Sequence, residues 1–458
     1  MAIATISPVT GEVLTSFEPH TPDQIEELIA AAHAAFGTLA ETTFEQRAGW
    51  MRAAADILES EADEVATLIS TEMGKTFGTA KYEALKCATG MRHFADNAES
   101  YLAPEQPVPA ASVGASDLTV RFDPIGVVLA IMPWNYPLWQ AVRFAAPALM
   151  AGNTGLLKHA SNVPQSALYL GALFERGGFP KGAFATLLIE GSAVAELMDD
   201  RRIRAATLTG SVGAGASIAA AAGRNVKKTV LELGGTDVFV VLPTADIERA
   251  AELGVTARVQ NTGQSCICAK RYYVHSAVYD RFTELFVAGM AKTVAGDPFD
   301  EASSFGPLAT EKGRNDVEEL VADAVAKGAT VLTGGTRPDG AGWFYPATVL
   351  ADVTPEMRIY REECFGPVAC LYRVDSLDEA VVRSNDSDFG LSSSVWTNDD
   401  AEIAELTRRI DAGGVFINGL TASFPAVPFG GVKDSGYGRE LSAHGIREFV
   451  NAKTVWRA

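Results

Sequence analysis

Cys266, on a glycine-bearing turn, is the strongest candidate for a nucleophile in the sequence. It lies in the segment Asn261-Thr-Gly-Gln-Ser-Cys266-Ile-Cys268, after an expected helix and before an expected strand that begins at Lys270. A cysteine on such a turn can be open to substrate and can meet backbone N–H groups, and both features favour a reactive thiolate. The alternative is that Cys266 and Cys268 are two small residues buried in the core.

A carboxylate and an amide are the next candidates. Glu232 ends an expected buried strand and is followed by Leu-Gly-Gly, and the two glycines let a ligand come close. A partly buried glutamate has a raised pKa and can act as a general base, although a strand-end glutamate in a salt bridge gives the same pattern. Asn135 precedes a helix that starts near Pro137, so its amide either caps that helix or stabilises an oxyanion.

Long amphipathic helices are expected in the first hundred residues, because apolar side chains recur there with a 3.6-residue period. The helices cover about 22–37, 44–73 and 76–101, and a proline-rich break follows at Pro104–Pro109. The segment Leu118–Phe122 then alternates in polarity like an exposed strand.

Strands and helices alternate along the rest of the chain, which is typical of parallel sheets covered by helices on both faces. Between 126 and 242 we expect strands at 127–132, 154–157, 183–188, 205–209, 229–231 and 238–242, with helices starting near 137, 164, 193 and 212. Between 246 and 432 we expect helices at 246–260, 277–293, 311–327, 376–384 and 400–411, and strands at 270–275, 329–333, 345–350, 367–374, 391–396 and 414–417. Such sheets bind nucleotides at the carboxyl ends of their strands, so we predict two α/β domains with a cleft between them.

The composition is that of a globular protein and argues against several classes of partner. The 458 residues, 47% of them apolar and 21% charged, suffice for two or three domains. A net charge of −19 argues against a nucleic-acid surface, and no apolar run approaches the roughly 18–20 residues of a membrane helix. Five cysteines without a visible secretory signal predict a reduced, cytoplasmic protein, and the scattered histidines predict no metal site.

Seven motifs, in order, resemble those of the aldehyde dehydrogenase superfamily over nearly the whole chain. They are Pro133-Trp-Asn-Tyr-Pro137, Lys158, Thr209-Gly-Ser211, Glu232-Leu-Gly-Gly235, Gly263-Gln-Ser-Cys266, Glu362-Glu-Cys-Phe-Gly-Pro367 and Pro428-Phe-Gly-Gly431. One motif alone would be weak evidence, but seven in order are specific. The resemblance implies an α/β fold with a Rossmann-like cofactor domain (1–105 and 125–233), an α/β catalytic domain (234–430) and a small β oligomerisation element (106–124 and 431–458) in a homodimer or homotetramer.

The same resemblance implies the chemistry. Cys266 matches the family nucleophile, which adds to the aldehyde carbonyl, while the Asn135 amide and the Cys266 N–H hold the oxyanion. Hydride then passes to a nicotinamide, and Glu232 matches the base that activates the water hydrolysing the thioester. The residues that match the family's cofactor site are Trp134, Lys158, Ser161, Gly210, Ser211, Glu363 and Phe365.

Ser161 is a departure from the family pattern that favours NADP. The family often has an acidic residue where this chain has Lys158-His-Ala-Ser161. A carboxylate there would bond the ribose hydroxyls and repel a 2′-phosphate, whereas a serine near Lys158 would accept that phosphate. We therefore predict a preference for NADP, without excluding NAD.

Arg143 is a second departure and concerns the substrate. It shares a helix face with Trp139, four residues earlier, and in the family this face lines the aldehyde tunnel. An uncompensated arginine in an apolar tunnel is unfavourable, so a carboxylated aldehyde explains it, with Ser423 as a second donor; the alternative is a structural ion pair. The pattern resembles succinate-semialdehyde dehydrogenases, and we predict oxidation of succinate semialdehyde or a similar short ω-carboxylated aldehyde.

Three other functions stay open. The chain could oxidise uncharged medium aliphatic or aromatic aldehydes, if Arg143 serves only the structure. It could be a CoA-acylating relative, against which Glu232 argues because hydrolysis needs a base. It could also be a catalytically dead structural or binding relative, against which the intact Cys266, Glu232 and Asn135 argue.

The Cys266–Cys268 pair also suggests redox control. Some succinate-semialdehyde dehydrogenases have a similar Cys-x-Cys pair, and the resemblance implies a reversible disulfide that protects the nucleophile from overoxidation. The alternative is that Cys268 is a small buried side chain that faces away.

Overall fold

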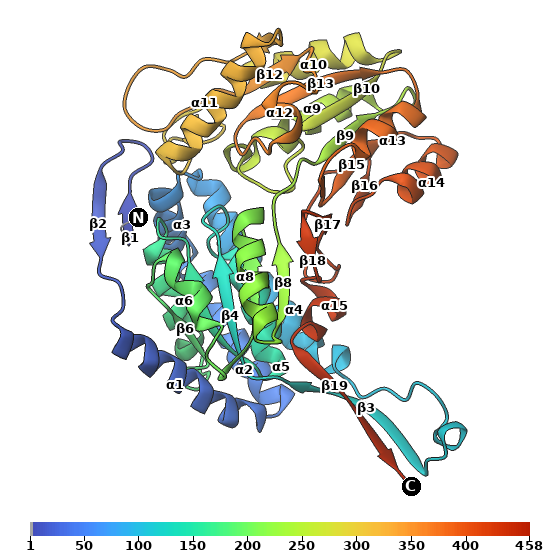
Figure 1. Cartoon of the computed structure of the whole chain (residues 1–458). Helices are drawn as coiled ribbons and strands as arrows, with labels where there is room; N and C mark the ends of the chain where they lie inside the picture. Colours follow the sequence, from blue (N-terminus) through green and yellow to red (C-terminus); the bar gives the residue numbers. More distant parts are fainter. Residues whose placement is uncertain (1–2) are drawn as a thin grey trace.

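The computed structural model describes residues 3–458 and contains two large sheets in separate parts of the molecule (Figure 1). The first sheet has the order β18-β8-β7-β4-β5-β6, in which β4 to β8 are parallel and β18 runs antiparallel to β8. Its strands are β4 (Val127–Met132), β5 (Thr154–His159), β6 (Phe184–Thr186), β7 (Ile203–Thr209), β8 (Lys228–Glu232) and β18 (Gly436–Tyr437).

Helices cover both faces of this sheet, because successive strand residues point to opposite sides. Val128 and Ala130 of β4 belong to the apolar cluster formed with α2 to α6, whereas Val127 and Leu129 belong to the cluster formed with α1, α7 and α8. The helices are α1 (Pro22–Ala40), α2 (Phe44–Ser60), α3 (Ala62–Met73), α4 (Phe77–Tyr101), α5 (Trp139–Ala151), α6 (Pro164–Arg176), α7 (Val194–Leu197), α8 (Val212–Arg224) and α15 (Ser442–Arg447).

The second sheet has the order β11-β12-β13-β10-β9-β15-β16 and is parallel except for its edge strand β11. Its strands are β9 (Val238–Val241), β10 (Arg271–His275), β11 (Thr330–Thr333), β12 (Thr348–Ala351), β13 (Val368–Val374), β15 (Ser393–Trp396) and β16 (Val415–Ile417). One face packs on α9 (Ile247–Val259) and α10 (Tyr279–Ala291), and the other on α11 (Glu311–Ala326), α13 (Leu377–Asn385) and α14 (Asp400–Arg409), with α12 (Arg358–Arg361) nearby. Both sheets therefore have the helix-covered parallel architecture that the alternating sequence pattern predicts.

Three two-stranded sheets complete the described chain: β1 (Ile3–Ile6) with β2 (Val13–Phe17), β14 (Phe389–Gly390) with β17 (Val432–Lys433), and β3 (Asp117–Pro124) with β19 (Val450–Arg457). The β3–β19 ribbon is antiparallel along its whole length and projects away from the rest of the molecule (Figure 1). Its outer residues Val455 and Trp456 are 42% and 50% exposed. The exposed strand expected near Leu118–Phe122 thus has a partner within its own chain.

Two expected helices differ from the structure because of long-range contacts. The helix expected over 44–73 is broken at Glu61, whose carboxylate accepts hydrogen bonds from Tyr169 and Arg176 on α6. The helix expected from about 137 begins at Trp139, where the carboxylate of Glu83 on α4 accepts the backbone N–H groups of the first turn. Within residues 3–458, no helix combines the length and the apolar character that crossing a membrane requires.

Candidate active site

The turn that carries Cys266 has an unusual backbone. Asn261, Thr262 and Gly263 have φ angles of 52°, 59° and 72°, the left-handed region that L-residues rarely occupy. A Cβ at Gly263 would lie 2.3 Å from the carbonyl oxygen of Gly366, so only glycine allows this approach. The turn is therefore a tight reversal between α9 and β10, as the glycine in the sequence suggests.

Buried cations hold the carbonyl groups of this turn. Lys270 Nζ lies 2.9 Å from the carbonyl oxygen of Cys266 and 3.1 Å from that of Ser265, and Arg258 donates to the carbonyl of Gly263 at 2.7 Å. Charge-assisted bonds of this kind fix the peptide units on both sides of the thiol. Neither cation is predicted from the sequence, because nothing local distinguishes Lys270 and Arg258 from other basic residues.

Cys266 lies where two cavities meet, one of about 260 Å³ and one of about 230 Å³. Its side chain is half-buried, and burial raises the pKa of the thiol to about 12. A thiol at the junction of two cavities can contact one ligand from each side. It needs a nearby base to become a thiolate at neutral pH.

Glu232 is a buried carboxylate without a hydrogen-bond partner among the described residues. Neither of its oxygens has a donor in the structure, and the side chain is 2% exposed. Burial, and then the charge of Glu440, hold its pKa well above the usual value. A carboxylate in this state has the proton affinity of a general base. The alternative, a salt bridge between Glu232 and a basic residue, is not found among residues 3–458.

Asn135 is tied to the nucleophile turn rather than to the helix that follows it. Its Nδ2 donates to the carbonyl of Gln264 at 3.1 Å, and Asn261 donates to the carbonyl of Asn135 at 2.8 Å. Helix α5 begins after Leu138 without a side-chain cap, so capping does not explain Asn135. The second N–H of its amide has no acceptor among the described residues and is available near Cys266.

The smaller cavity lies at the carboxyl ends of β4, β7 and β8. Its wall contains Trp134, Asn135, Gly210, Ser211, Cys266, Glu363 and Phe365. The rings of Trp134 and Phe365 meet edge to face, with their centroids 5.7 Å apart. Ser211 caps α8, accepting the N–H of Ala214 at 3.3 Å, so the positive end of that helix faces the cavity. This position and chemistry suit a dinucleotide.

Glu363 is held in this cavity by two donors. Its Oε1 lies 3.1 Å from the N–H of Gly235 and 3.1 Å from Lys270 Nζ. A Cβ at Gly234 would lie 2.6 Å from Glu363 Oε2, so the glycine makes room for the carboxylate. Lys270 therefore links the Cys266 turn to a carboxylate that is suited to bonding ribose hydroxyls.

Lys158 and Ser161 lie outside the wall of this cavity, at the end of β5. Lys158 is buried, with 8% of its surface exposed, and forms no ion pair with any carboxylate of residues 3–458. Burial lowers the pKa of its ammonium group. A buried cation without a counter-ion favours binding of an anion.

The larger cavity contains all three residues expected to contact the substrate. Trp139, Arg143 and Ser423 line it together with Cys266. The guanidinium of Arg143, however, forms a buried ion pair with Glu440 and stacks 4.7 Å from the ring centroid of Phe429. The expectation of an uncompensated arginine is therefore wrong, because the carboxylate of Glu440, 297 positions further along the chain, neutralises Arg143. Both residues are buried, with 5% of their surface exposed or less.

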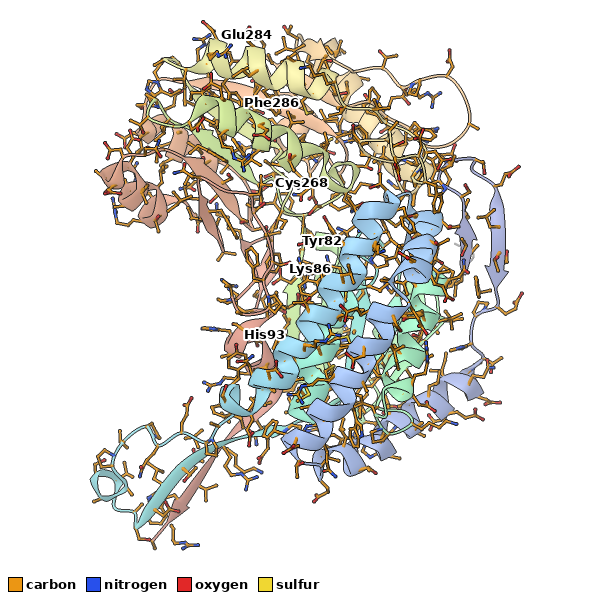
Figure 2. The ribbon with its side chains drawn as sticks, turned by 180° about the vertical axis from the view of Figure 1, so that it is seen from behind. Tyr82, Lys86, His93, Cys268, Glu284 and Phe286 are labelled. Carbon is orange, nitrogen blue, oxygen red and sulfur yellow. The ribbon has the colours of Figure 1, made fainter. Side chains whose placement is uncertain are left out.

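Three charged residues that the sequence analysis missed also line this cavity. Lys75 and Glu83 form a buried ion pair, and Lys86 reaches the cavity from the next turn of α4. In the sequence Glu83 and Lys86 fit the polar face of an amphipathic helix and Lys75 precedes that helix, so no local signal separates them from solvated residues. Figure 2 shows Tyr82 and Lys86 following one another along α4 below the segment that carries Cys268.

Cys268 is fully buried and is not among the residues that line either cavity. Its Sγ lies 3.6 Å from the carbonyl oxygen of Gln260, and all five cysteines are free thiols. This placement favours the packing role over the redox role, and a disulfide with Cys266 stays a prediction.

Comparison with known proteins identifies the family. The sequence pattern of the aldehyde dehydrogenase family matches residues 1–455. The chain belongs to the aldehyde dehydrogenase family. A protein of Paenarthrobacter nicotinovorans named aldehyde dehydrogenase is 74% identical over 456 residues, covering both chains completely. The family assignment confirms the fold and the aldehyde-oxidising, NAD(P)-dependent chemistry that the seven motifs predict.

Two further relatives are named for a specific aldehyde. Succinate-semialdehyde dehydrogenase [NADP(+)] 1 of Mycobacterium tuberculosis is 57% identical over 458 residues, covering both chains completely. The crystal structure of succinic semialdehyde dehydrogenase from Streptococcus pyogenes in complex with NADP+ superposes with a TM-score of 0.96 at 35% identity, over 99% of each chain. This aldehyde dehydrogenase is thus similar along its whole length to enzymes named for a carboxylated aldehyde.

Proposed function

We propose that this aldehyde dehydrogenase oxidises succinate semialdehyde, or a similar short ω-carboxylated aldehyde, to the acid. The observation that carries the proposal is the cavity of about 260 Å³ that ends at Cys266 and has three basic residues, Lys75, Lys86 and Arg143, in its wall. Lys75 and Arg143 have acidic partners, whereas Lys86 forms no ion pair with a carboxylate of residues 3–458. An uncharged aldehyde needs no such cation, whereas a substrate carboxylate is stabilised by it. The names of the relatives from M. tuberculosis and S. pyogenes support the same substrate class.

Cys266, Asn135 and Glu232 would supply the steps of the proposed chemistry. Cys266 Sγ bonds to the aldehyde carbon as its proton leaves to water, either directly or through Glu232, which passes it on to solvent before the second step; the Asn135 amide and the Cys266 N–H stabilise the oxyanion. When bound, the nicotinamide accepts the hydride that this adduct releases. Glu232 then takes a proton from the water that attacks the resulting thioester, and Sγ leaves as the carboxylic acid forms. The uncommitted carboxylate of Glu232 is the structural feature that supports hydrolysis rather than transfer to a thiol acceptor.

We propose NADP as the preferred cofactor. Lys158 is a buried cation without a carboxylate partner among the described residues, and Ser161 follows three positions later, at the point where a carboxylate would repel a 2′-phosphate. Glu363, Trp134, Phe365, Gly210 and Ser211 would hold the nicotinamide ribose and the pyrophosphate in the smaller cavity. The relative from M. tuberculosis is named for NADP(+), and the structure from S. pyogenes is a complex with NADP+, which supports this assignment.

We also propose that the β3–β19 ribbon is the oligomerisation element. It joins the segments 106–124 and 431–458 and exposes Val455 and Trp456. Exposed apolar side chains on a projecting two-stranded ribbon are typical of an interface with a second copy. The cofactor domain would then comprise 1–105 and 125–233, and the catalytic domain 234–430.

Steady-state kinetics with four aldehydes tests the proposed function. We would measure kcat/KM for succinate semialdehyde, glutarate semialdehyde, butanal and benzaldehyde, each with NADP and with NAD. The proposal expects the highest kcat/KM for a carboxylated aldehyde with NADP. A higher kcat/KM for butanal or benzaldehyde than for both carboxylated substrates would contradict it.

A further inference from the structure

The basic residues of the substrate cavity differ in how they are neutralised. Lys75 pairs with Glu83, and both side chains are 2% exposed or less. Glu83 also accepts the N–H groups of Leu138 and Trp139, so its carboxylate is fully committed. Arg143 pairs with Glu440, which is buried as well. Two of the three positive charges are therefore balanced within the protein.

Lys86 is the cation that is left over. No carboxylate among residues 3–458 forms an ion pair with it, although its side chain is half-buried in the cavity wall. Its Nζ lies 4.4 Å from the ring centroid of Trp139 and donates to Ser423 Oγ at 3.1 Å. An aromatic face and a neutral hydroxyl compensate an ammonium group only in part. The described cavity thus carries an excess positive charge at Lys86.

Ser423 adds a free donor at the same point. Its Oγ accepts the indole N–H of Trp139 at 2.8 Å as well as the ammonium of Lys86. Both contacts use the hydroxyl as an acceptor, and its own hydrogen has no acceptor among the described residues. Lys86 and Ser423 therefore present two adjacent donors, which match the two oxygens of a carboxylate.

We propose that Lys86 Nζ and the Ser423 hydroxyl bind the carboxylate of the substrate, and that Lys86 is the residue that selects a carboxylated aldehyde over an uncharged one. The inference rests on the proposed function and assigns its charge selectivity to α4 rather than to Arg143. Arg143, paired with Glu440, then forms part of the wall and lowers the pKa of Glu232 from a distance. An ammonium group on a four-carbon stem can shift from Ser423 to the incoming carboxylate without leaving a buried carboxylate unpaired.

The test compares Lys86→Met with Lys86→Arg and with a matched control on the same helix. Lys81→Met removes a lysine of α4 that is 43% exposed and pairs with Asp63, away from the cavity. Lys86→Met should lower kcat/KM for succinate semialdehyde about ten- to a hundredfold, mainly through KM, since one charge-assisted contact is lost. The loss for butanal should be much smaller. Lys86→Arg should keep more of the preference than Lys86→Met, and Lys81→Met should behave as the wild type.

A binding measurement makes the result independent of the chemical step. Succinate, the product, carries the same carboxylate, so its inhibition constant should rise in Lys86→Met by a similar factor and stay unchanged in Lys81→Met. A wild type that prefers succinate semialdehyde and a Lys86→Met variant that keeps both the preference and the succinate affinity would overturn this inference alone. A wild type without that preference would instead overturn the proposed function.

Discussion

The two cavities that meet at Cys266 are built in different ways. The cofactor side is formed mostly by loops that directly follow β4, β7 and β8, together with Cys266, Glu363 and Phe365, so its residues stand in short motifs. The substrate side is formed by α4, α5 and the segment from Leu420 to Phe429, which lie far apart in the chain. The residues of the cofactor wall can therefore be recognised from short sequence motifs, whereas those of the substrate wall come together only in the folded chain. We expect substitutions in the two walls to have different effects on activity and stability.

The largest expected effect falls on the atom that both cavities share. Cys266→Ala should abolish NADPH formation with every aldehyde, because no covalent adduct forms. Binding of NADP to the variant, measured by calorimetry, should survive, since the cofactor wall is intact. Cys268→Ala is the matched control and should retain turnover, because that side chain lines neither cavity and its thiol hydrogen bonds to the carbonyl of Gln260. Residual turnover in Cys266→Ala at a tenth of the wild-type rate would refute the assigned nucleophile.

The next effect separates the two halves of the reaction. Glu232→Gln should give a burst of about one equivalent of NADPH and then a steady rate lower by roughly 10²–10⁴, because thioester hydrolysis lacks its base. Rapid-mixing absorbance at 340 nm follows both phases. A steady rate equal to that of the wild type would show that another group activates the water.

The comparison of the two walls also explains how much the sequence could predict. The parallel sheets, the Cys266 turn and the strand-end residues Glu232 and Asn135 were predicted because strand periodicity and short motifs are local properties. The partner of Arg143 was not, since Glu440 reaches it from a segment near the end of the chain. Lys86 was not predicted for a different reason: an amphipathic helix has the same sequence pattern whether a lysine faces water or a cavity.

Arg143 lies in the substrate wall, where its partner Glu440 comes from a distant part of the sequence. Arg143→Met should lower the free energy of unfolding by about 3–5 kcal/mol, since Glu440 would be buried without a partner. It should reduce kcat/KM for succinate semialdehyde and butanal by similar factors. The double variant Arg143→Met/Glu440→Gln should regain much of the stability, as measured by urea unfolding. A loss confined to succinate semialdehyde, at unchanged stability, would instead make Arg143 the ligand of the carboxylate.

A smaller change is expected at Ser161, which lies outside the wall of the smaller cavity, after the end of β5. Ser161→Glu should shift the preference toward NAD by about tenfold or more, roughly 1.4 kcal/mol, because the new carboxylate repels a 2′-phosphate and can bond the ribose hydroxyls. The ratio of kcat/KM for NADP and NAD measures the shift, and Ser161→Gln controls for size without charge. A wild type that already prefers NAD by more than tenfold would contradict the phosphate argument.

The smallest expected effect is a pH dependence confined to the substrate wall. Burial lowers the pKa of Lys86 to about 8, so the side chain is charged below that pH and neutral above it. The charged or titratable groups that face it are Glu83 and Cys87 on α4, Lys75 just before α4, and Arg143 on α5, with Trp139 and Ser423 as its neutral contacts.

The ionisations of Cys266 and Glu232 act on every aldehyde and cancel in a ratio of two substrates. The ratio of kcat/KM for succinate semialdehyde to that for butanal should therefore fall several-fold between pH 7 and pH 9, by about tenfold at most, as Lys86 loses its charge. Lys86→Arg stays protonated throughout this range and should show a flat ratio. A ratio that falls equally in the wild type and in Lys86→Arg would place the titrating group elsewhere in the cavity and remove Lys86 from the recognition of the carboxylate.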